Sequence, residues 1–285
     1  DSLPSRGLGD VYKRQQMTQP VSAQDAPKKV VFLMSGMCQI MDSGLRLYGH
    51  PQLLGIAASI NGDDFVPYND AIFVKLPGLG GSVSWHQDGV THWDSPQWDQ
   101  GIHGFNFQVQ LYDTSARSCL WVVPGTHKDG KLDIKELVAQ NQGSEFLPDA
   151  VPLFAKAGDV TIVNRQALHA SFANTSKDTR ISLTFGFHRR SSVLGACGAL
   201  SQTNDEVYDA ERIDQRSRVI AVAIDARQQF YPQEDRYSYQ PMLGRETELE
   251  FSEATWNKVI RDYNLQDLSI SVSYTHLRAH ETEEN

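Results

Sequence analysis

Cysteine is scarce in this sequence, and its cysteines are far apart. Three occur among the 285 residues, at Cys38, Cys119 and Cys197, and no two of them form a Cys-x-x-Cys pair. Thiolate zinc sites and disulfide frameworks need paired or clustered cysteines, so the sequence indicates neither. The scarcity favours a reducing compartment, and we expect a cytoplasmic protein.

An excess of positive charge is also lacking. The chain has 26 Lys and Arg residues against 35 Asp and Glu residues, which gives a formal net charge of -9 at pH 7. Binding to nucleic acid requires clustered Lys and Arg side chains. We therefore expect no nucleic-acid partner.

Long apolar runs are missing as well. The stretch 30–34, VVFLM, is far shorter than the roughly 18 residues that span a bilayer. It also lies too far into the chain for a convincing signal peptide. We therefore expect no membrane partner, and the hydrophobic fraction of 40% and charged fraction of 21% are ordinary for a soluble globular protein.

Both ends of the chain differ from the sequence that adjoins them. Residues 1–16 and 271–285 share no periodicity with their neighbours and resemble translated sequencing-adapter read-through. We expect them to be non-native tails, and residues 17–270 to form a single domain with helical N- and C-terminal elements. If they are instead ordinary disordered tails, the functional interpretation is the same.

Short strand patterns separated by turn signals dominate the middle of the chain. There is neither βαβ alternation nor an internal repeat, so the pattern favours an all-β barrel or jelly roll. Helical periodicity covers 35–60, where His50-Pro51 separates two helices, and also 133–141 and 252–263. The expected strands are 71–76, 83–88, 105–112, 120–123, 151–154, 160–163 and 181–187.

A histidine and an aspartate lie two residues apart in the strand pattern 83–88. Side chains at i and i+2 of a strand point to the same face, so His86 and Asp88 project side by side. A third candidate ligand, His169, follows the expected strand 160–163 by a few residues. Two imidazoles and one carboxylate form the facial triad that leaves positions open on Fe(II), although zinc can use the same ligand types.

An arginine follows this histidine at a suitable interval. Arg180 stands 11 residues after His169, at the start of a strand pattern. In an antiparallel hairpin Arg180 would return beside His169, and Ser171 would share its face. The planar guanidinium binds a carboxylate through two hydrogen bonds, as a keto-acid co-substrate would require.

Two further segments offer candidate substrate residues. The strand pattern 105–112 alternates, and its polar face, with Gln108 and Gln110, either meets solvent or lines a polar cavity. The loop 89–104 begins beside the His86 motif and is either a lid or a surface excursion. Its Trp93 and Trp98 could stack on a substrate or simply anchor the loop.

The order of these motifs along residues 45–190 resembles the phytanoyl-CoA dioxygenase family. The motifs are Trp85-His86-Gln87-Asp88-Gly89, Val122-Val123-Pro124-Gly125-Thr126-His127-Lys128, Ala157-Gly158-Asp159, Leu168-His169-Ala170-Ser171 and Arg180. The resemblance implies a mainly β protein with flanking helices, whose core is a double-stranded β-helix (a jelly roll, cupin-like). It also implies Fe(II) bound by His86, Asp88 and His169, with 2-oxoglutarate as co-substrate. Arg180 would pair with the far carboxylate of 2-oxoglutarate, Ser171 would assist, and Asn69 would add a polar contact.

The reaction implied by the resemblance consumes dioxygen and converts 2-oxoglutarate to succinate and CO2 while a small-molecule substrate is hydroxylated. Halogenating relatives lack the carboxylate ligand and hold halide in its place, so Asp88 favours hydroxylation. Two alternatives remain open at this point. One is a cupin-like metalloenzyme that does not use 2-oxoglutarate, and the other is a non-catalytic metabolite-binding module.

Overall fold

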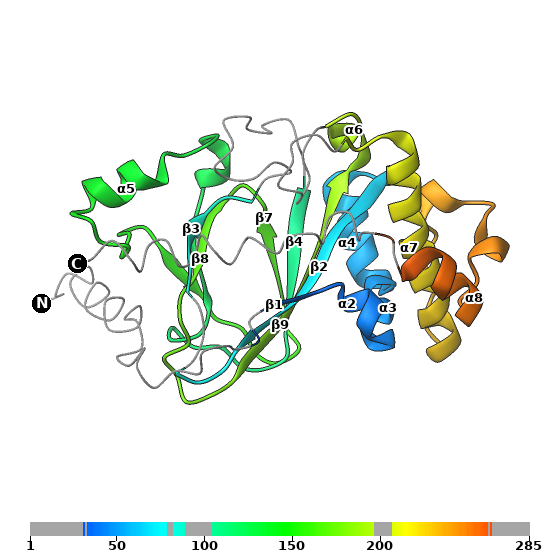
Figure 1. The fold of residues 1–285 in the computed structure, drawn as a ribbon, viewed down its shortest axis with the longest axis horizontal. Helices are drawn as coiled ribbons and strands as arrows, with labels where there is room; N and C mark the ends of the chain where they lie inside the picture. The colour runs from blue at the N-terminus through cyan, green and yellow to red at the C-terminus, as the bar shows by residue number, and fades with distance from the viewer. Residues whose placement is uncertain are drawn as a thin grey trace, which may run out of the picture.

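Two antiparallel β-sheets form the centre of the molecule, and most of the helices lie against one of them (Figure 1). The computed structural model describes residues 31, 33–78, 82–88, 104–196, 207–261 and 263. The five-stranded sheet has the order β1 (Leu33–Ser35), β2 (Phe65–Lys75), β9 (Arg180–Arg189), β4 (Gly104–Gln110) and β7 (Val160–Asn164). The four-stranded sheet has the order β3 (Val83–His86), β8 (Leu168–Ser171), β5 (Leu120–Val123) and β6 (Val151–Leu153). The expected mainly β jelly roll with flanking helices is confirmed.

The α-helices are α2 (Met37–Ile40), α3 (Asp42–Tyr48), α4 (Pro51–Asn61), α5 (Ile134–Gln140), α6 (Arg190–Val193), α7 (Ala210–Phe230) and α8 (Glu253–Thr255). Short 3-10 turns form η1 (Thr126–Lys128), η2 (Gln240–Met242) and η3 (Glu246–Leu249), and η4 (Trp256–Ile260) is a π-helical turn. Figure 1 shows α2, α3, α4, α7 and α8 together on the β2 side, whereas α5 lies near β3 and β8.

The five-stranded sheet has an apolar face that packs against the helices. Phe105 and Phe107 of β4 and Phe185 and Phe187 of β9 are at most 3% exposed and belong to the main hydrophobic cluster. The same cluster includes Val219, Ile220, Val222 and Ala223 of α7. Burial of aromatic side chains of this size is a large source of stability. The apolar residues of the alternating strands therefore hold the sheet against the helices.

The opposite face of the same sheet is polar and also buried. Gln108 is 8% exposed and Gln110 3% exposed, and Arg180 and Ser182 of β9 are nearly inaccessible. Figure 1 places the four-stranded sheet on the side of β4 and β9 away from α7. The polar face of β4 therefore lines the interior between the sheets, and the alternative of a solvent-facing strand is wrong.

Strand β2 begins six residues earlier than the apolar pattern 71–76 predicts. Its first half contains Pro67 and a register shift between Pro67 and Asp70, where pairing with β9 is interrupted. Proline and bulges both weaken the strand pattern in a sequence. At this interruption the carbonyl oxygens of Pro67 and Tyr68 accept hydrogen bonds from Arg216 of α7.

Helix α7, the longest in the described part of the chain, is not predicted by the sequence pattern. The sequence pattern predicts the clearest C-terminal helix over 252–263. That stretch instead forms α8 and the π-turn η4, whereas Ala210–Phe230 forms 21 residues of helix after an Asp209 N-cap that accepts a hydrogen bond from Arg212 N. Among the described helices, α7 included, none has both the length and the apolar character needed to span a membrane.

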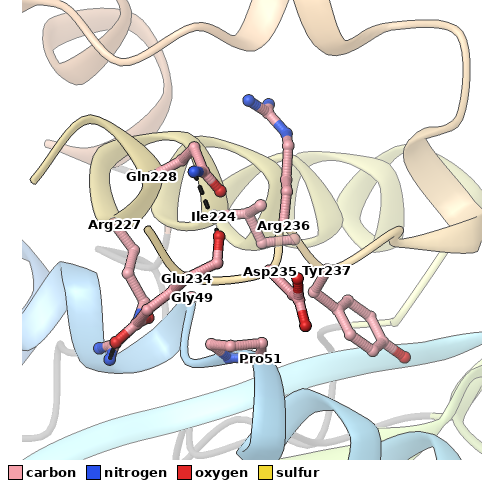
Figure 2. Close-up of a pocket in the computed structure, with 9 residues that line it drawn as sticks. All are labelled: Gly49, Pro51, Ile224, Arg227, Gln228, Glu234, Asp235, Arg236 and Tyr237. Atoms are coloured by element: carbon pink, nitrogen blue, oxygen red, sulfur yellow. Dashed lines mark hydrogen bonds and ion pairs between the residues drawn. The ribbon is translucent and has the colours of Figure 1, made fainter. Parts of the chain in front are cut away.

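The junction between α3 and α4 packs closely on α7. Pro51 is the first residue of α4, as the His50-Pro51 break predicts. A Cβ atom at Gly49 would lie only 2.2 Å from the carbonyl oxygen of Ala223, so a side chain there would collide with α7. Figure 2 shows Gly49 and Pro51 at this junction, where Arg227 forms hydrogen bonds of 2.5 and 2.7 Å to the carboxylate of Glu234.

Candidate metal centre

Two histidines face each other across the β3–β8 strand pair. His86 and His169 are register partners, and their ring centroids are 4.1 Å apart. Asp88 follows β3, with its Oδ1 3.5 Å from His86 Nε2 and its Oδ2 3.7 Å from His169 Nε2. One ligand atom from each residue lies within 4.8 Å of the other two. The structure thus brings together the three residues that the sequence proposes as metal ligands.

Each histidine is held by the backbone carbonyl of the residue two positions before it. His86 Nδ1 lies 2.8 Å from Ser84 O, and His169 Nδ1 lies 2.8 Å from Ala167 O. A carbonyl oxygen can only accept a hydrogen bond, so in the neutral form of each ring Nδ1 carries the proton and Nε2 keeps its lone pair. Two lone pairs and a carboxylate then converge on one point without a proton between them, which is an arrangement that favours a bound cation.

The charge state of these groups suits a divalent cation. Burial, together with the neighbouring His86, lowers the pKa of His169 to about 4, so its imidazole is neutral near pH 7. Burial acts to raise the pKa of Asp88, but His169, His86 and Arg165 outweigh it and hold that pKa below its usual range. One carboxylate and two imidazoles are the ligand types of the facial triad used for Fe(II).

Trp85 and Gln87, which alternate with the ligands His86 and Asp88, anchor the motif on the other side of the strand. Trp85 Nε1 donates to Glu145 O at 2.8 Å. Gln87 Nε2 donates to the carbonyl oxygens of Gly130 and Gln166 at 2.9 and 2.8 Å, and Gln87 Oε1 accepts from Leu132 N at 2.9 Å. Alternation thus gives Trp85 and Gln87 an anchoring role while His86 and Asp88 meet the interior.

One polar neighbour of the ligand set was not identified from the sequence. Asn106 of β4 donates a hydrogen bond from Nδ2 to Asp88 Oδ2 at 2.8 Å. Alternation in 105–112 had put Asn106 on the same face as Gln108 and Gln110. That shared face is the sequence signal for a polar role of Asn106. Its hydrogen-bond partner, Asp88, follows only from how the two sheets pack.

A second polar group lies around Arg180 at the start of β9. Arg180 is 1% exposed, and its Nη1 donates to Ser171 Oγ at 2.7 Å. Burial lowers its pKa to about 10, which leaves the guanidinium protonated near pH 7. Among the described residues Arg180 forms no ion pair, and its Nε has no hydrogen-bond partner. A buried cation of this kind is costly without an anion.

Other buried polar atoms on the same sheet face also lack partners among the described residues. They are Gln110 Oε1, Ser182 Oγ and Thr184 Oγ1. Gln108 pairs in register with Thr184, and Gln110 with Ser182, while Gln110 Nε2 donates to Gln108 Oε1 at 2.9 Å. The sequence-proposed residues Gln108, Gln110, Ser171 and Arg180 therefore all belong to the polar interior. Buried hydrogen-bonding groups without partners suit a polar ligand.

Three sequence-proposed residues cannot be placed in the site. The side chain of Asn69 and the whole of Trp93 and Trp98 lie outside the described residues. Most of the proposed lid, residues 89–103, also lies outside them.

Comparison with known proteins gives a consistent result. The sequence model of the phytanoyl-CoA dioxygenase family (PhyH) matches residues 16–182, which is more than half of the chain. The chain is 31% identical over 119 residues to phytanoyl-CoA dioxygenase 1 of Oryza sativa subsp. japonica, covering 39% of this chain and 40% of that protein. It is 31% identical over 115 residues to phytanoyl-CoA dioxygenase of Arabidopsis thaliana, covering 37% and 38%. The chain thus spans about 40% of the length of these curated relatives.

A solved structure shares the fold. The apoform of EctD from S. alaskensis matches with a TM-score of 0.50 and 15% sequence identity, over 72% of this chain and 75% of that one. At this identity the likeness concerns the fold alone. Together with the family match, the ordered motifs and the converging histidines and aspartate, it leads to one assignment. The chain belongs to the phytanoyl-CoA dioxygenase family.

Proposed function

We propose that this protein is an Fe(II)- and 2-oxoglutarate-dependent dioxygenase that hydroxylates a small-molecule substrate. Enzymes of its family use Fe(II) and 2-oxoglutarate. The observation that carries the proposal is the convergence of His86 Nε2, His169 Nε2 and the Asp88 carboxylate, with both Nδ1 atoms tied to carbonyl groups. Such a set leaves coordination positions open for a co-substrate and dioxygen.

In this proposal the three ligands hold Fe(II) and the polar interior holds 2-oxoglutarate. Bound there, the ion and its co-substrates supply the oxidising chemistry, with succinate and CO2 as co-products. Arg180 binds the far carboxylate of 2-oxoglutarate, which gives its buried charge a partner. Ser171 orients the guanidinium, and Gln108, Gln110 and Thr184, on the same face of the sheet, would offer hydrogen bonds to the co-substrate.

Asp88 supports hydroxylation as the outcome. It fills the third protein position of the ligand set, and its Oδ2 is already engaged by Asn106. A halide bound in its place would require this carboxylate to be absent.

The first experiment measures 2-oxoglutarate binding apart from turnover. Isothermal titration of the Co(II)-loaded chain with 2-oxoglutarate is expected to give a defined Kd, and Arg180→Ala is expected to weaken it at least about tenfold through loss of the charged hydrogen bonds. Arg218→Ala is the matched control, because Arg218 pairs with Asp214 on α7, away from the sheet interior. If the wild-type protein binds no 2-oxoglutarate, the proposal fails.

The second experiment measures succinate release with Fe(II) across a panel of metabolites. Stimulated release that disappears in His86→Ala, Asp88→Ala and His169→Ala is the expected result. Metal-dependent turnover that is unchanged by Arg180→Ala would instead identify a metalloenzyme that does not use 2-oxoglutarate. Tight metabolite binding without turnover, unaffected by a chelator, would identify a non-catalytic binding module.

A further inference from the structure

The carboxylate of Asp88 has two different environments at its two oxygen atoms. Oδ2 accepts a hydrogen bond from Asn106 Nδ2 at 2.8 Å and lies 3.7 Å from His169 Nε2. Oδ1 lies 3.5 Å from His86 Nε2. Asn106 comes from β4, in the other sheet, so this hydrogen bond joins the ligand set to the five-stranded sheet.

The space for Asn106 comes from a glycine directly opposite it on β9. Asn106 and Gly186 are register partners. A Cβ atom at Gly186 would lie 2.3 Å from Asn106 Oδ1, closer than side chains approach, and 3.0 Å from Phe105 O, a tight contact. Gly186 is not among the glycines with positive φ, so its backbone does not require glycine. A glycine inside a strand lowers stability and marks a close approach, and here that approach is made by the Asn106 side chain.

We infer that Asn106 is a positioning residue that makes Asp88 a one-oxygen metal ligand, and that Gly186 provides the room it needs. This inference rests on the metal site of the proposed function. The amide N–H holds Oδ2 and thereby leaves Oδ1 as the metal-facing atom. A carboxylate that bound through both oxygen atoms would occupy an additional coordination position. By preventing this, Asn106 keeps positions open for the co-substrates.

The inference is tested by Co(II) binding, which does not depend on turnover. Isothermal titration and the visible absorption spectrum of bound Co(II) are compared for the wild-type chain, Asn106→Ala and Gly186→Ala. Loss of a hydrogen-bond partner behind a metal ligand weakens metal binding by about 10- to 100-fold. We expect that loss in Asn106→Ala, together with a changed Co(II) spectrum because Asp88 is free to bind through both oxygen atoms. Gly186→Ala should give the same direction of change, since its methyl group displaces Asn106.

The double variant separates this role from a general disturbance of the sheet. If Gly186 acts through Asn106, Asn106→Ala/Gly186→Ala binds Co(II) no more weakly than Asn106→Ala alone. Losses that simply add would overturn the role of Gly186. Asn257→Ala and Gly55→Ala are matched controls, because Asn257 is an exposed residue of η4 and a Cβ at Gly55 of α4 meets nothing within 4 Å. Both should keep the wild-type Kd.

The outcomes distinguish this inference from the function it rests on. If wild-type protein binds no Co(II), the metal site itself is refuted. If wild-type protein binds Co(II) and Asn106→Ala binds it with the same Kd and the same spectrum, the positioning role is refuted while the proposed function stands. Thermal unfolding of each variant shows whether it is folded at the titration temperature.

Discussion

His86 and His169 are held in the same way on neighbouring strands. Each Nδ1 lies 2.8 Å from the carbonyl oxygen of the residue two positions earlier, Ser84 in one case and Ala167 in the other. The two rings are therefore oriented before any metal binds, with both Nε2 atoms directed toward Asp88. Preorganised ligands of this kind make the metal site sensitive to single substitutions.

Loss of one histidine ligand should abolish tight metal binding. We expect His169→Ala to weaken Co(II) affinity by more than about 100-fold. Removal of a metal ligand lowers the affinity more than removal of a residue that is only hydrogen-bonded to a ligand. Isothermal titration measures this directly. His50→Ala is the control, since His50 caps α4 in the helical layer and should leave the Kd unchanged. Equal affinities for wild type and His169→Ala would contradict the assignment of this ligand.

The metal-free protein should lose stability as the pH falls from about 6.5 to about 4. Burial lowers the pKa of His169 from 6.5 to about 4, so the unfolded chain binds a proton in this window that the folded chain does not. The stabilising contribution is complete above pH 6.5 and is lost on acidification, up to about 3 kcal/mol. Urea unfolding in the presence of a chelator at pH 7.5 and 4.5 measures it. His169→Gln should show a smaller difference between the two pH values, and an equal difference would exclude this histidine as the cause.

Lys75 should contribute to stability although its side chain is fully buried. Its Nζ donates to the carbonyl oxygens of Ser171 and Phe172, at the end of β8 beside Arg180. Lys75→Met leaves these buried acceptors without that donor, and we expect a loss of about 1–3 kcal/mol in the free energy of unfolding. Lys156→Met is the control, because Lys156 is 79% exposed in its pair with Asp113 and should change stability by less than about 1 kcal/mol. Urea unfolding compares the two, and equal effects would contradict the structural role of Lys75.

The α3–α4 junction should not tolerate a methyl group. In Gly49→Ala the new Cβ would lie 2.2 Å from Ala223 O, so α7 has to move, and we expect a loss of about 1–3 kcal/mol. Gly55→Ala places the same methyl group on α4 in open space. There it should stabilise the protein by about 0.5–1 kcal/mol through helix propensity. Thermal unfolding with opposite signs for the two variants is the expected pattern, and a neutral Gly49→Ala would show that the junction is loosely packed.

Local alternation explains why the sequence predicts the ligand set. The i, i+2 relation of His86 and Asp88 depends only on strand geometry. The expected antiparallel hairpin between the His169 strand and the Arg180 strand is wrong, because β8 and β9 belong to different sheets. Arg180 nevertheless lies beside Ser171, nine residues earlier, and the two are hydrogen-bonded at 2.7 Å. These relations are short in sequence or repeat with a period of two, so a single sequence reveals them.

The features that the sequence does not reveal depend on distant partners. Helix α7 buries Arg216 and Asp225, and these charges obscure its apolar face in the sequence. Arg216 is satisfied by the carbonyl groups of β2, and Asp225 accepts from Arg236 Nη1 at 2.9 Å and from Phe251 N at 2.7 Å. Asn106 is likewise meaningful only through Asp88, in the other sheet. Such pairings follow from the register and packing of the folded chain.

Strand β3 lies at the edge of the four-stranded sheet, with β8 as its neighbour in the sheet order. Within the described residues its register with β8 rests on two pairs, and one of them is His86 with His169. These two residues are 83 positions apart in the sequence. An ion held by both would cross-link the edge strand to β8 and close a long loop of the chain. In this chain a metal would thus stabilise the pairing of β3 with β8 as well as form the reaction centre. Its release would destabilise the fold first at β3.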